Sequence, residues 1–302
     1  MKEIFSNTSL TVICSLFDRS RQSWYEMNSR KDRSGLQQEL IVSWVNQIRS
    51  VLPRVGCVKL MHILKQNFQE HQINHGRDAF SSLLRKHGLL IQIRKRYVTT
   101  TNSHHHFKRW PDLINRVPAI MPEQVWVSDI TYLRTENGFA YLFLITDAYS
   151  RKIVGYHLSQ TLKASGCVLA MNKALKERIY PKRPLIHHSD RGIQYCCQEY
   201  VSLLIRNRIQ ISMTQSGSPY DNAIAERVNG ILKTEFGLYK TFSSYAQAVA
   251  PVHQAILKYN QFRPHLSCDL MTPQARHKPI PSQNKNISKG DVRFNPYLFF
   301  QT

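Results

Sequence analysis

Hydrophobic residues near the start of the chain recur at helical spacing. In the segment 36–51, Leu40, Trp44 and Ile48 follow one another every four residues, which places their side chains on one face of a helix. The other segments with helical character are 8–27, which is expected to hold two short helices around a turn near Asp18, 57–68 and 75–89.

The last of these helices is basic and follows a turn at Gly76. Three short helices in this arrangement are typical of a helix-turn-helix DNA-binding unit, although a generic helical bundle fits the same pattern. Residues 1–98 are therefore predicted to be a helical DNA-binding region of helix-turn-helix type. Residues 99–122 are rich in Lys, Arg and His and lack a helical period, so we predict a basic linker that lies along DNA.

From residue 123 on, the pattern is that of strands alternating with helices. The expected strands are 124–134, 139–150, 152–160, 184–190 and 209–214, and the expected helices are 164–179, 196–208, 223–236 and 244–261. Three consecutive strands followed by alternating helix and strand predict an α/β domain with a mixed sheet and flanking helices. We place this domain at 123–280 and a short irregular tail at 281–302.

The charge narrows the choice of partner. The chain has 302 residues, of which 42% are hydrophobic, and 41 Lys and Arg stand against 20 Asp and Glu, a net charge of +21. Such an excess favours a polyanion, whether DNA, RNA or an anionic surface. No apolar run is long enough to span a membrane, and the N-terminus does not resemble a signal peptide. The six scattered cysteines are expected to be free thiols in the cytoplasm.

Three acids in the second domain are candidates for phosphoryl-transfer chemistry on DNA. Asp129 lies in the first strand, Asp190 ends the fourth, and Glu226 lies in the first turns of the helix that follows a Gly/Ser/Pro loop. Alone, each has a structural explanation: a salt-bridged strand residue, the start of a turn, or an acid that complements a helix dipole. Together they offer the carboxylate oxygens that Mg²⁺ prefers. Asp147 is interpreted as structural, bonding the turn after its strand.

Several nearby residues are expected to support this chemistry. His188 is predicted to orient a ligand or substrate, and Asp221 to support the loop before the helix or, with Asn222, to cap that helix. Lys233 lies on the same helix face as Glu226, where it is expected to meet a phosphate. The residues expected to bind DNA outside the catalytic helix are Arg85, Lys86, Arg94, Lys95 and Arg96.

The amino-acid sequence around the three acids resembles that of a known family. "WVSDITYL", "LFLITDAYSRKIVGY", "HHSDRGIQYCCQEYVSLL" and "ISMTQSGSPYDNAIAERVNGILKTE" closely resemble the transposases of the insertion-sequence-three family, in particular their second reading frame. The thirty-five residues between Asp190 and Glu226 match the DD(35)E pattern of retroviral integrases and related transposases. The resemblance is strong over about 120–277 and looser before. Val228 stands where family members often carry an aromatic residue, which is expected to alter packing and leave the chemistry intact.

The resemblance implies a ribonuclease-H-like fold and a DNA transposase of a bacterial insertion sequence. It implies that two Mg²⁺ ions, with Mn²⁺ as a substitute, are held by Asp129, Asp190 and Glu226, and that the enzyme cleaves the element ends and joins the 3′-OH to a DNA phosphodiester. The implied partners are the terminal inverted repeats in double-stranded DNA, target DNA, further copies in a dimer or larger assembly on DNA, and, left open, a helix-turn-helix protein from an upstream reading frame.

Two other functions stay open: a metal-dependent nuclease of the same fold that does not join strands, and a non-catalytic DNA-binding derivative. Retention of all three carboxylates argues against the derivative, and the separate segment 1–122 argues mildly against the nuclease. Either way the protein is expected at the bacterial nucleoid in the cytoplasm, without a membrane.

Overall fold

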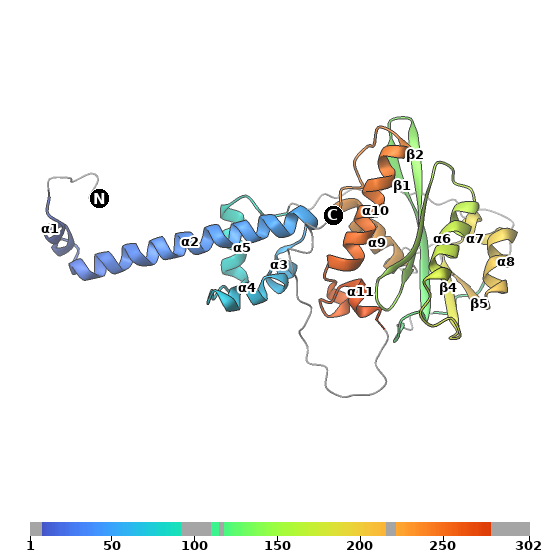
Figure 1. The fold of residues 1–302 in the computed structure, drawn as a ribbon, viewed down its shortest axis with the longest axis horizontal. Coiled ribbons are helices and arrows are strands. Elements are labelled where there is room, and N and C mark those ends of the chain that lie inside the picture. Colours follow the sequence, from blue (N-terminus) through green and yellow to red (C-terminus); the bar gives the residue numbers. More distant parts are fainter. Residues whose placement is uncertain (1–7, 92–109, 115–117, 216–221, 279–302) are drawn as a thin grey trace. The chain divides into compact units, whose positions relative to one another are not determined.

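The computed structural model describes residues 8–91, 110–114, 118–215 and 222–278, and Figure 1 shows their secondary structure. The chain divides into two compact units, one formed by 1–50 with 56–90 and the other by 51–55 with 91–302. Within the described ranges, no helix is long and apolar enough to cross a membrane. All six cysteines lie in these ranges and are free thiols, as predicted.

The first unit is helical, as the sequence predicts. Its helices are α1 (Leu10–Ser15), α2 (Arg21–Val51), α3 (Cys57–Ile63), α4 (Lys65–Glu70) and α5 (Arg77–Lys86). Its buried side chains come from several helices and include Ile41, Val45, Leu60, Phe68 and Phe80. The ring of Phe68 packs edge-on against that of Phe80, with 5.8 Å between the ring centroids. The predicted face of α2 is confirmed at Ile48, which is 3% exposed.

Two details of the helix prediction are wrong. The second short helix expected within 8–27 and the helix expected at 36–51 are one continuous helix, α2. Residues 21–51 contain no proline, and Gly35 alone costs only about 1 kcal/mol relative to alanine. The helix expected at 57–68 is instead interrupted at Leu64, whose backbone has φ −82° and ψ 0° between α3 and α4.

The second unit contains a five-stranded mixed sheet in the order β3-β2-β1-β4-β5. The strands are β1 (Val125–Thr135), β2 (Gly138–Asp147), β3 (Ile153–Ser159), β4 (Leu185–Ser189) and β5 (Ile209–Met213). β1, β2 and β3 are antiparallel neighbours, whereas β4 is parallel to β1 and β5 is parallel to β4. The predicted mixed sheet, and each of its five strands, is thereby confirmed.

Helices cover both faces of this sheet (Figure 1). On one face, Trp126 and Phe143 pack with side chains of α6 (Ser165–Lys176), α7 (Ile193–Cys196) and α8 (Gln198–Arg206). On the other, Leu142 and Leu144 pack with α9 (Ala223–Glu235) and α10 (Tyr245–Phe262). The last described helices are a 3₁₀ turn, Leu266–Cys268, and α11 (Pro273–Arg276). Val228 and Ile231 of α9 are 1% and 2% exposed and form part of the buried cluster with Leu142 and Leu144.

The β1–β2 hairpin extends past the rest of the sheet. β1 has 11 residues and β4 has 5, and β4 pairs with β1 only from Val125 to Val127. Figure 1 shows the two long strands continuing beyond β4 and β5. The end of β4 therefore meets β1 in its middle, and the residues there can form a site at the edge of the sheet.

Part of the predicted linker belongs to the second unit. Pro111 accepts a hydrogen bond from the Met213 backbone, Leu113 donates to the Ser212 hydroxyl at 2.8 Å, and Trp110 packs against the core. Residues 110–113 of the predicted linker 99–122 therefore pack along β5 and the core of the second unit.

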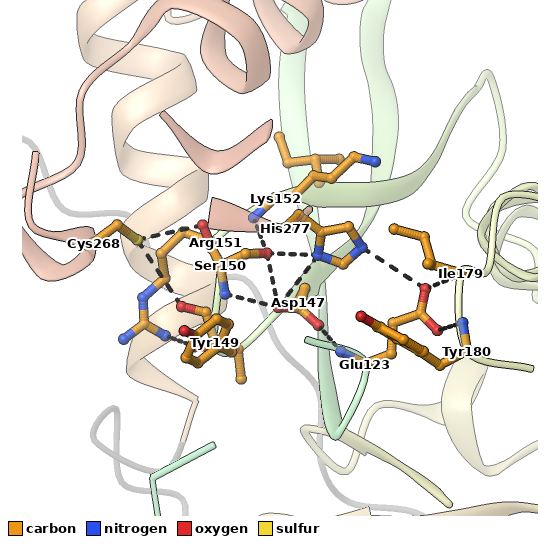
Figure 2. A network of polar contacts seen from close by, with 12 residues as sticks. Glu123, Asp147, Tyr149, Ser150, Arg151, Lys152, Ile179, Tyr180, Cys268 and His277 are labelled. Carbon is orange, nitrogen blue, oxygen red and sulfur yellow. Dashed lines mark hydrogen bonds and ion pairs between the residues drawn. The ribbon is translucent and has the colours of Figure 1, made fainter. Parts of the chain in front are cut away.

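A buried polar network fixes the last described residues to the sheet (Figure 2). The His277 ring lies between two carboxylates, with Nε2 3.8 Å from Glu123 and Nδ1 3.7 Å from Asp147. Asp147 also accepts from the backbone N–H and the hydroxyl of Ser150, at 2.7 and 2.8 Å. This confirms that Asp147 is structural and bonds the turn after β2. His277 is 2% exposed, so the network is closed to substrates.

Candidate active site

The three predicted acids come from three separate elements of the second unit. Asp129 lies in the middle of β1, Asp190 directly follows β4, and Glu226 lies in the first turn of α9. Because β1 and β4 are parallel neighbours and α9 packs on β1, these positions converge at the edge of the sheet.

The Asp129 carboxylate is held by two hydrogen bonds. Its Oδ1 accepts from the Ile130 backbone at 2.9 Å, and its Oδ2 accepts from the Asn229 side chain at 2.6 Å. Burial and the negative charge of Asp190 raise the pKa of Asp129 to about 7, with a further contribution from Glu226, although both hydrogen bonds act in the opposite direction. The raised pKa shows that the three acids are close enough to repel one another.

Asp190 is the electrostatic neighbour of both other acids. Glu226 is exposed, and burial and then Asp190 raise its pKa. The Asp190 Oδ1 accepts from the Gly192 backbone at 3.0 Å, and a Cβ at position 192 would lie only 3.0 Å from that same oxygen. Glycine at 192 therefore leaves room beside the carboxylate, while the Arg191 guanidinium donates to the carbonyl groups of Thr214 and Gln215.

The three carboxylates have the chemistry to bind a divalent cation, but their side chains are not already gathered around one point. Within the described part of the chain, no three His, Cys, Asp or Glu side chains are gathered as a ready-made metal site. Carboxylate oxygens are nevertheless the ligands that Mg²⁺ prefers. A cation between Asp129, Asp190 and Glu226 would also relieve the repulsion that raises the pKa of Asp129.

Two groups of contacts hold α9, the helix that carries Glu226. At its start, the Asn222 side chain donates to the Ser128 carbonyl at 2.9 Å. At its end, Glu235 forms a bidentate ion pair with buried Arg263, with N–O distances of 2.7 and 2.6 Å. Asn222 occupies the predicted N-cap position, but its side chain makes no cap hydrogen bond, because it bonds to β1 instead.

The other predicted site residues are placed as follows. His188 is fully buried, and its Nδ1 lies 2.8 Å from the Ser212 hydroxyl of β5 and 3.9 Å from the Asp112 carboxylate. Lys233 is partly buried near Asp129; burial lowers the pKa of its ammonium group, and Asp129 opposes this. Arg85 and Lys86 are exposed at the end of α5. The predicted residues outside the described ranges are Asp221, Arg94, Lys95 and Arg96.

Sequence reasoning missed two residues beside the acids. Asn229 donates a hydrogen bond directly to Asp129, and Gly192 leaves room beside Asp190. The available signal for Asn229 was its spacing, one helical turn after Glu226.

Comparisons with known proteins identify the family of this chain. Two models described as "Integrase core domain" match residues 120–219 and 207–273. The IS600 uncharacterized 31 kDa protein of Shigella sonnei is 31% identical over 267 residues, 87% of this chain and 96% of that protein. Transposase InsF for IS3A of Escherichia coli K12 is 29% identical over 286 residues, 93% of this chain and 96% of that protein. The chain belongs to the insertion-sequence-three (IS3) family of transposases.

A shorter match is the putative transposase for IS986/IS6110 of Mycobacterium tuberculosis CDC 1551, which is 37% identical over 170 residues, 54% of this chain and 60% of that protein. Among solved structures, the HTLV-2 integrase catalytic core domain in complex with magnesium matches 53% of this chain and 99% of its own, at 17% identity and TM-score 0.42. The simian T-cell lymphotropic virus intasome matches 79% of this chain and 78% of its own, at 18% identity and TM-score 0.46.

Membership of the IS3 family confirms the resemblance found in the sequence. The antiparallel β1, β2 and β3, followed by parallel β4 and β5 with helices on both faces, are the ribonuclease-H-like arrangement that the resemblance implied. As a member of this transposase family with an integrase-like catalytic domain, the chain is an enzyme that acts on DNA.

Proposed function

We propose that this transposase cleaves DNA at the ends of its insertion element and joins the resulting 3′-OH to a phosphodiester of target DNA. The observation that carries the proposal is the convergence of Asp129, Asp190 and Glu226, where burial and then the charges of Asp190 and Glu226 raise the pKa of Asp129 to about 7. Carboxylates that repel one another lower the stability of the fold unless a cation binds between them. Such arrangements cluster at active sites.

Asp129, Asp190 and Glu226 would hold Mg²⁺, in our proposal two ions, with Mn²⁺ as a substitute. Bound there, the ions supply neutralisation of the scissile phosphate and activation of the attacking oxygen. Asn229 orients the Asp129 carboxylate through its 2.6 Å hydrogen bond. Lys233, on the same face of α9, is placed to meet a phosphate oxygen as a point charge.

The partners follow from charge and family. We assign the terminal inverted repeats of the element to the first unit, with Arg85 and Lys86 and, outside the described ranges, Arg94, Lys95 and Arg96 near the DNA. The net charge of +21 fits binding of both element and target DNA. We further propose assembly of two or more copies on DNA at the bacterial nucleoid, in the cytoplasm.

A joining assay with a pre-cleaved element end tests this function. In Mg²⁺, the unaltered chain should join the end to target DNA, and Asp129→Asn, Asp190→Asn and Glu226→Gln should each abolish joining and cleavage while DNA binding persists. Glu199→Gln, an exposed acid on α8, is the matched control and should stay active.

The alternatives predict other outcomes. Cleavage without joining would identify a nuclease, and DNA binding without either reaction would identify a non-catalytic derivative. Normal joining by any one of the three carboxylate variants would remove that residue from the site.

A further inference from the structure

Three aromatic side chains form an exposed cluster on the β1–β2 hairpin, which we call the hairpin aromatic cluster: Tyr132, Phe139 and Tyr141. The ring centroid of Tyr132 lies 5.9 Å from that of Phe139 and 5.1 Å from that of Tyr141, with interplanar angles of 83° and 73°. Both contacts are edge-to-face, and such a contact occupies at most one face of a ring. Tyr132 therefore joins the three rings into one aromatic surface.

The outer part of this cluster is not part of the protein core. Tyr141 packs partly against the core on the α6 face, but Phe139 is 49% exposed and Tyr132 is partly exposed. Phe139 pairs across the hairpin with Arg134, which is also exposed on the same face. A contiguous exposed aromatic surface with a basic residue on the same face is typical of a binding site.

The cluster lies beside the candidate active site. Tyr132 follows Asp129 by three residues on β1, about 10 Å along a strand. Because the two residues are three positions apart, the Tyr132 side chain lies on the opposite face of β1 from Asp129. Helix α7, which begins directly after Gly192, packs on the same face as Tyr132. The Tyr132 phenol is also near the two acids: burial raises its pKa most, followed by Tyr141, Asp190 and Asp129 in that order. A nucleotide whose phosphate met the carboxylates would thus have the cluster within reach of its neighbouring base.

We propose that the hairpin aromatic cluster binds an unpaired nucleobase of the DNA end by stacking it on the exposed ring of Phe139, which Tyr132 supports edge-on, while the adjoining phosphate lies at the carboxylates. This inference rests on the proposed function and names a nucleotide-binding site within it. Every base has a π-face, so this site accepts any base and keeps the end open without reading its sequence. The exposed guanidinium of Arg134 lies where it can neutralise a phosphate of the same strand.

A forked DNA tests the proposal. The probe is a duplex with a short unpaired end whose first unpaired base is 2-aminopurine, and its partner is the fully paired duplex of the same sequence. Both are titrated into the full chain without divalent metal, so that no cleavage occurs. The unaltered chain should prefer the fork and quench the 2-aminopurine fluorescence. Phe139→Ala should lose about tenfold in affinity for the fork, the effect of removing one stacked ring, and most of the quenching.

Two further variants make this result specific. Phe139→Trp keeps an aromatic ring and should restore fork binding and quenching. Tyr239→Ala removes another exposed aromatic residue of the second unit, 37% exposed and beyond the opposite end of α9 from Glu226, and should change neither. Tyr132→Leu should repeat the loss seen with Phe139→Ala, and because Phe139 is exposed, Phe139→Ala tests the site without disturbing the core.

Two results would overturn the inference. One is equal fork binding and quenching by the unaltered chain and Phe139→Ala. The other is a change of oligomeric state by Phe139→Ala with fork binding intact, which would make the cluster a contact between copies. If the unaltered chain joins DNA ends and the carboxylate variants do not, either result removes only this site; if the unaltered chain neither binds nor joins DNA ends, the proposed function itself fails.

Discussion

At Asp129 in β1, burial and then the charges of Asp190 and Glu226 raise the pKa of the carboxyl group to about 7 from an ordinary value of 3.8. Between these two pH values the folded state binds more protons than the unfolded state, so stability falls as the pH rises from 3.8 and is lowest above 7. The candidate site is therefore expected to lower the stability of the metal-free protein at neutral pH.

The Asp129→Asn variant should be more stable than the unaltered protein when no metal is present. At pH 8 the expected gain is on the order of 2 kcal/mol, allowing for the partial exposure of the side chain, and near pH 4 it should vanish. Urea unfolding in EDTA across this pH range measures the difference. Added Mg²⁺ should then stabilise the unaltered protein more than the variant. A gain that does not depend on pH would show that charge repulsion at Asp129 is not its cause.

At this scale, the sequence predicted the acids and missed their neighbours. Asp129, Asp190 and Glu226 carry a spacing and flanking residues that a sequence preserves. The bond from Asn229 to Asp129 depends on how α9 lies on β1, which no local pattern specifies. The same holds for Asn222, which was expected to cap α9 and instead reaches the Ser128 carbonyl.

Among the elements, the strands were the most predictable and the helix breaks the least. Every predicted strand is present, because alternating or continuous apolar runs bounded by turns are local signals. The continuity of α2 was missed because Gly35 and its polar neighbours resemble a linker, whereas in a long helix the flanking turns carry the helix through.

The packing of α6 on β3 depends on Gly155. A Cβ at this position would lie 2.4 Å from the Ala170 carbonyl oxygen and 2.8 Å from the Ala174 Cβ. Gly155→Ala should therefore destabilise the protein by roughly 1–3 kcal/mol through overpacking. Gly230→Ala is the control, because nothing lies within 4 Å of a Cβ there and α9 should gain about 0.5–1 kcal/mol from the better helix former. Chemical denaturation measures both, and a tolerated Gly155→Ala would mean that α6 moves freely on the sheet.

The network in Figure 2 makes the C-terminal end of the described chain sensitive to pH. Burial alone would lower the pKa of His277, but its hydrogen bonding with Asp147 and Glu123 outweighs this and raises it, with Lys152 acting in opposition. A histidine with a raised pKa stabilises the fold fully below its ordinary value of 6.5 and loses that contribution as the pH rises through the raised value.

His277→Gln should therefore cost most at mildly acidic pH. At pH 6 the expected loss is about 3 kcal/mol, since Asp147 loses the cation beside it and Glu123 keeps only Arg178, at 3.5 Å, and the loss should shrink as the pH rises to 9. Thermal unfolding over pH 6–9 measures the trend. Ser150→Ala is a partial control, because it removes the 2.9 Å hydrogen bond to His277 without removing charge and should lower stability evenly across the range. A loss for His277→Gln that is constant with pH would mean that His277 is neutral in the fold.

On the scale of the whole molecule, the sequence indicated a polyanion partner and predicted a helical DNA-binding region followed by an α/β catalytic domain. Net charge is a property of composition alone, so the +21 excess could be stated before any fold was known. The boundary of the second unit could not be placed, because Trp110 and Pro111 follow a basic segment without periodicity and their contacts with the core and β5 are long-range.

Recognition of the element end by the first unit can be tested with full-length variants. Arg85 and Lys86 are exposed together at the end of α5, so removing both charges should delete up to two phosphate contacts with the element end. The logarithm of the binding constant falls linearly with the logarithm of salt concentration, and its slope should become shallower by about two in the Arg85→Ala, Lys86→Ala double variant. Lys182→Ala, an exposed lysine of the second unit, should leave the slope for element-end DNA closer to that of the unaltered chain. An unchanged slope in the double variant, with a reduced one for Lys182→Ala, would place the phosphate contacts on the second unit instead.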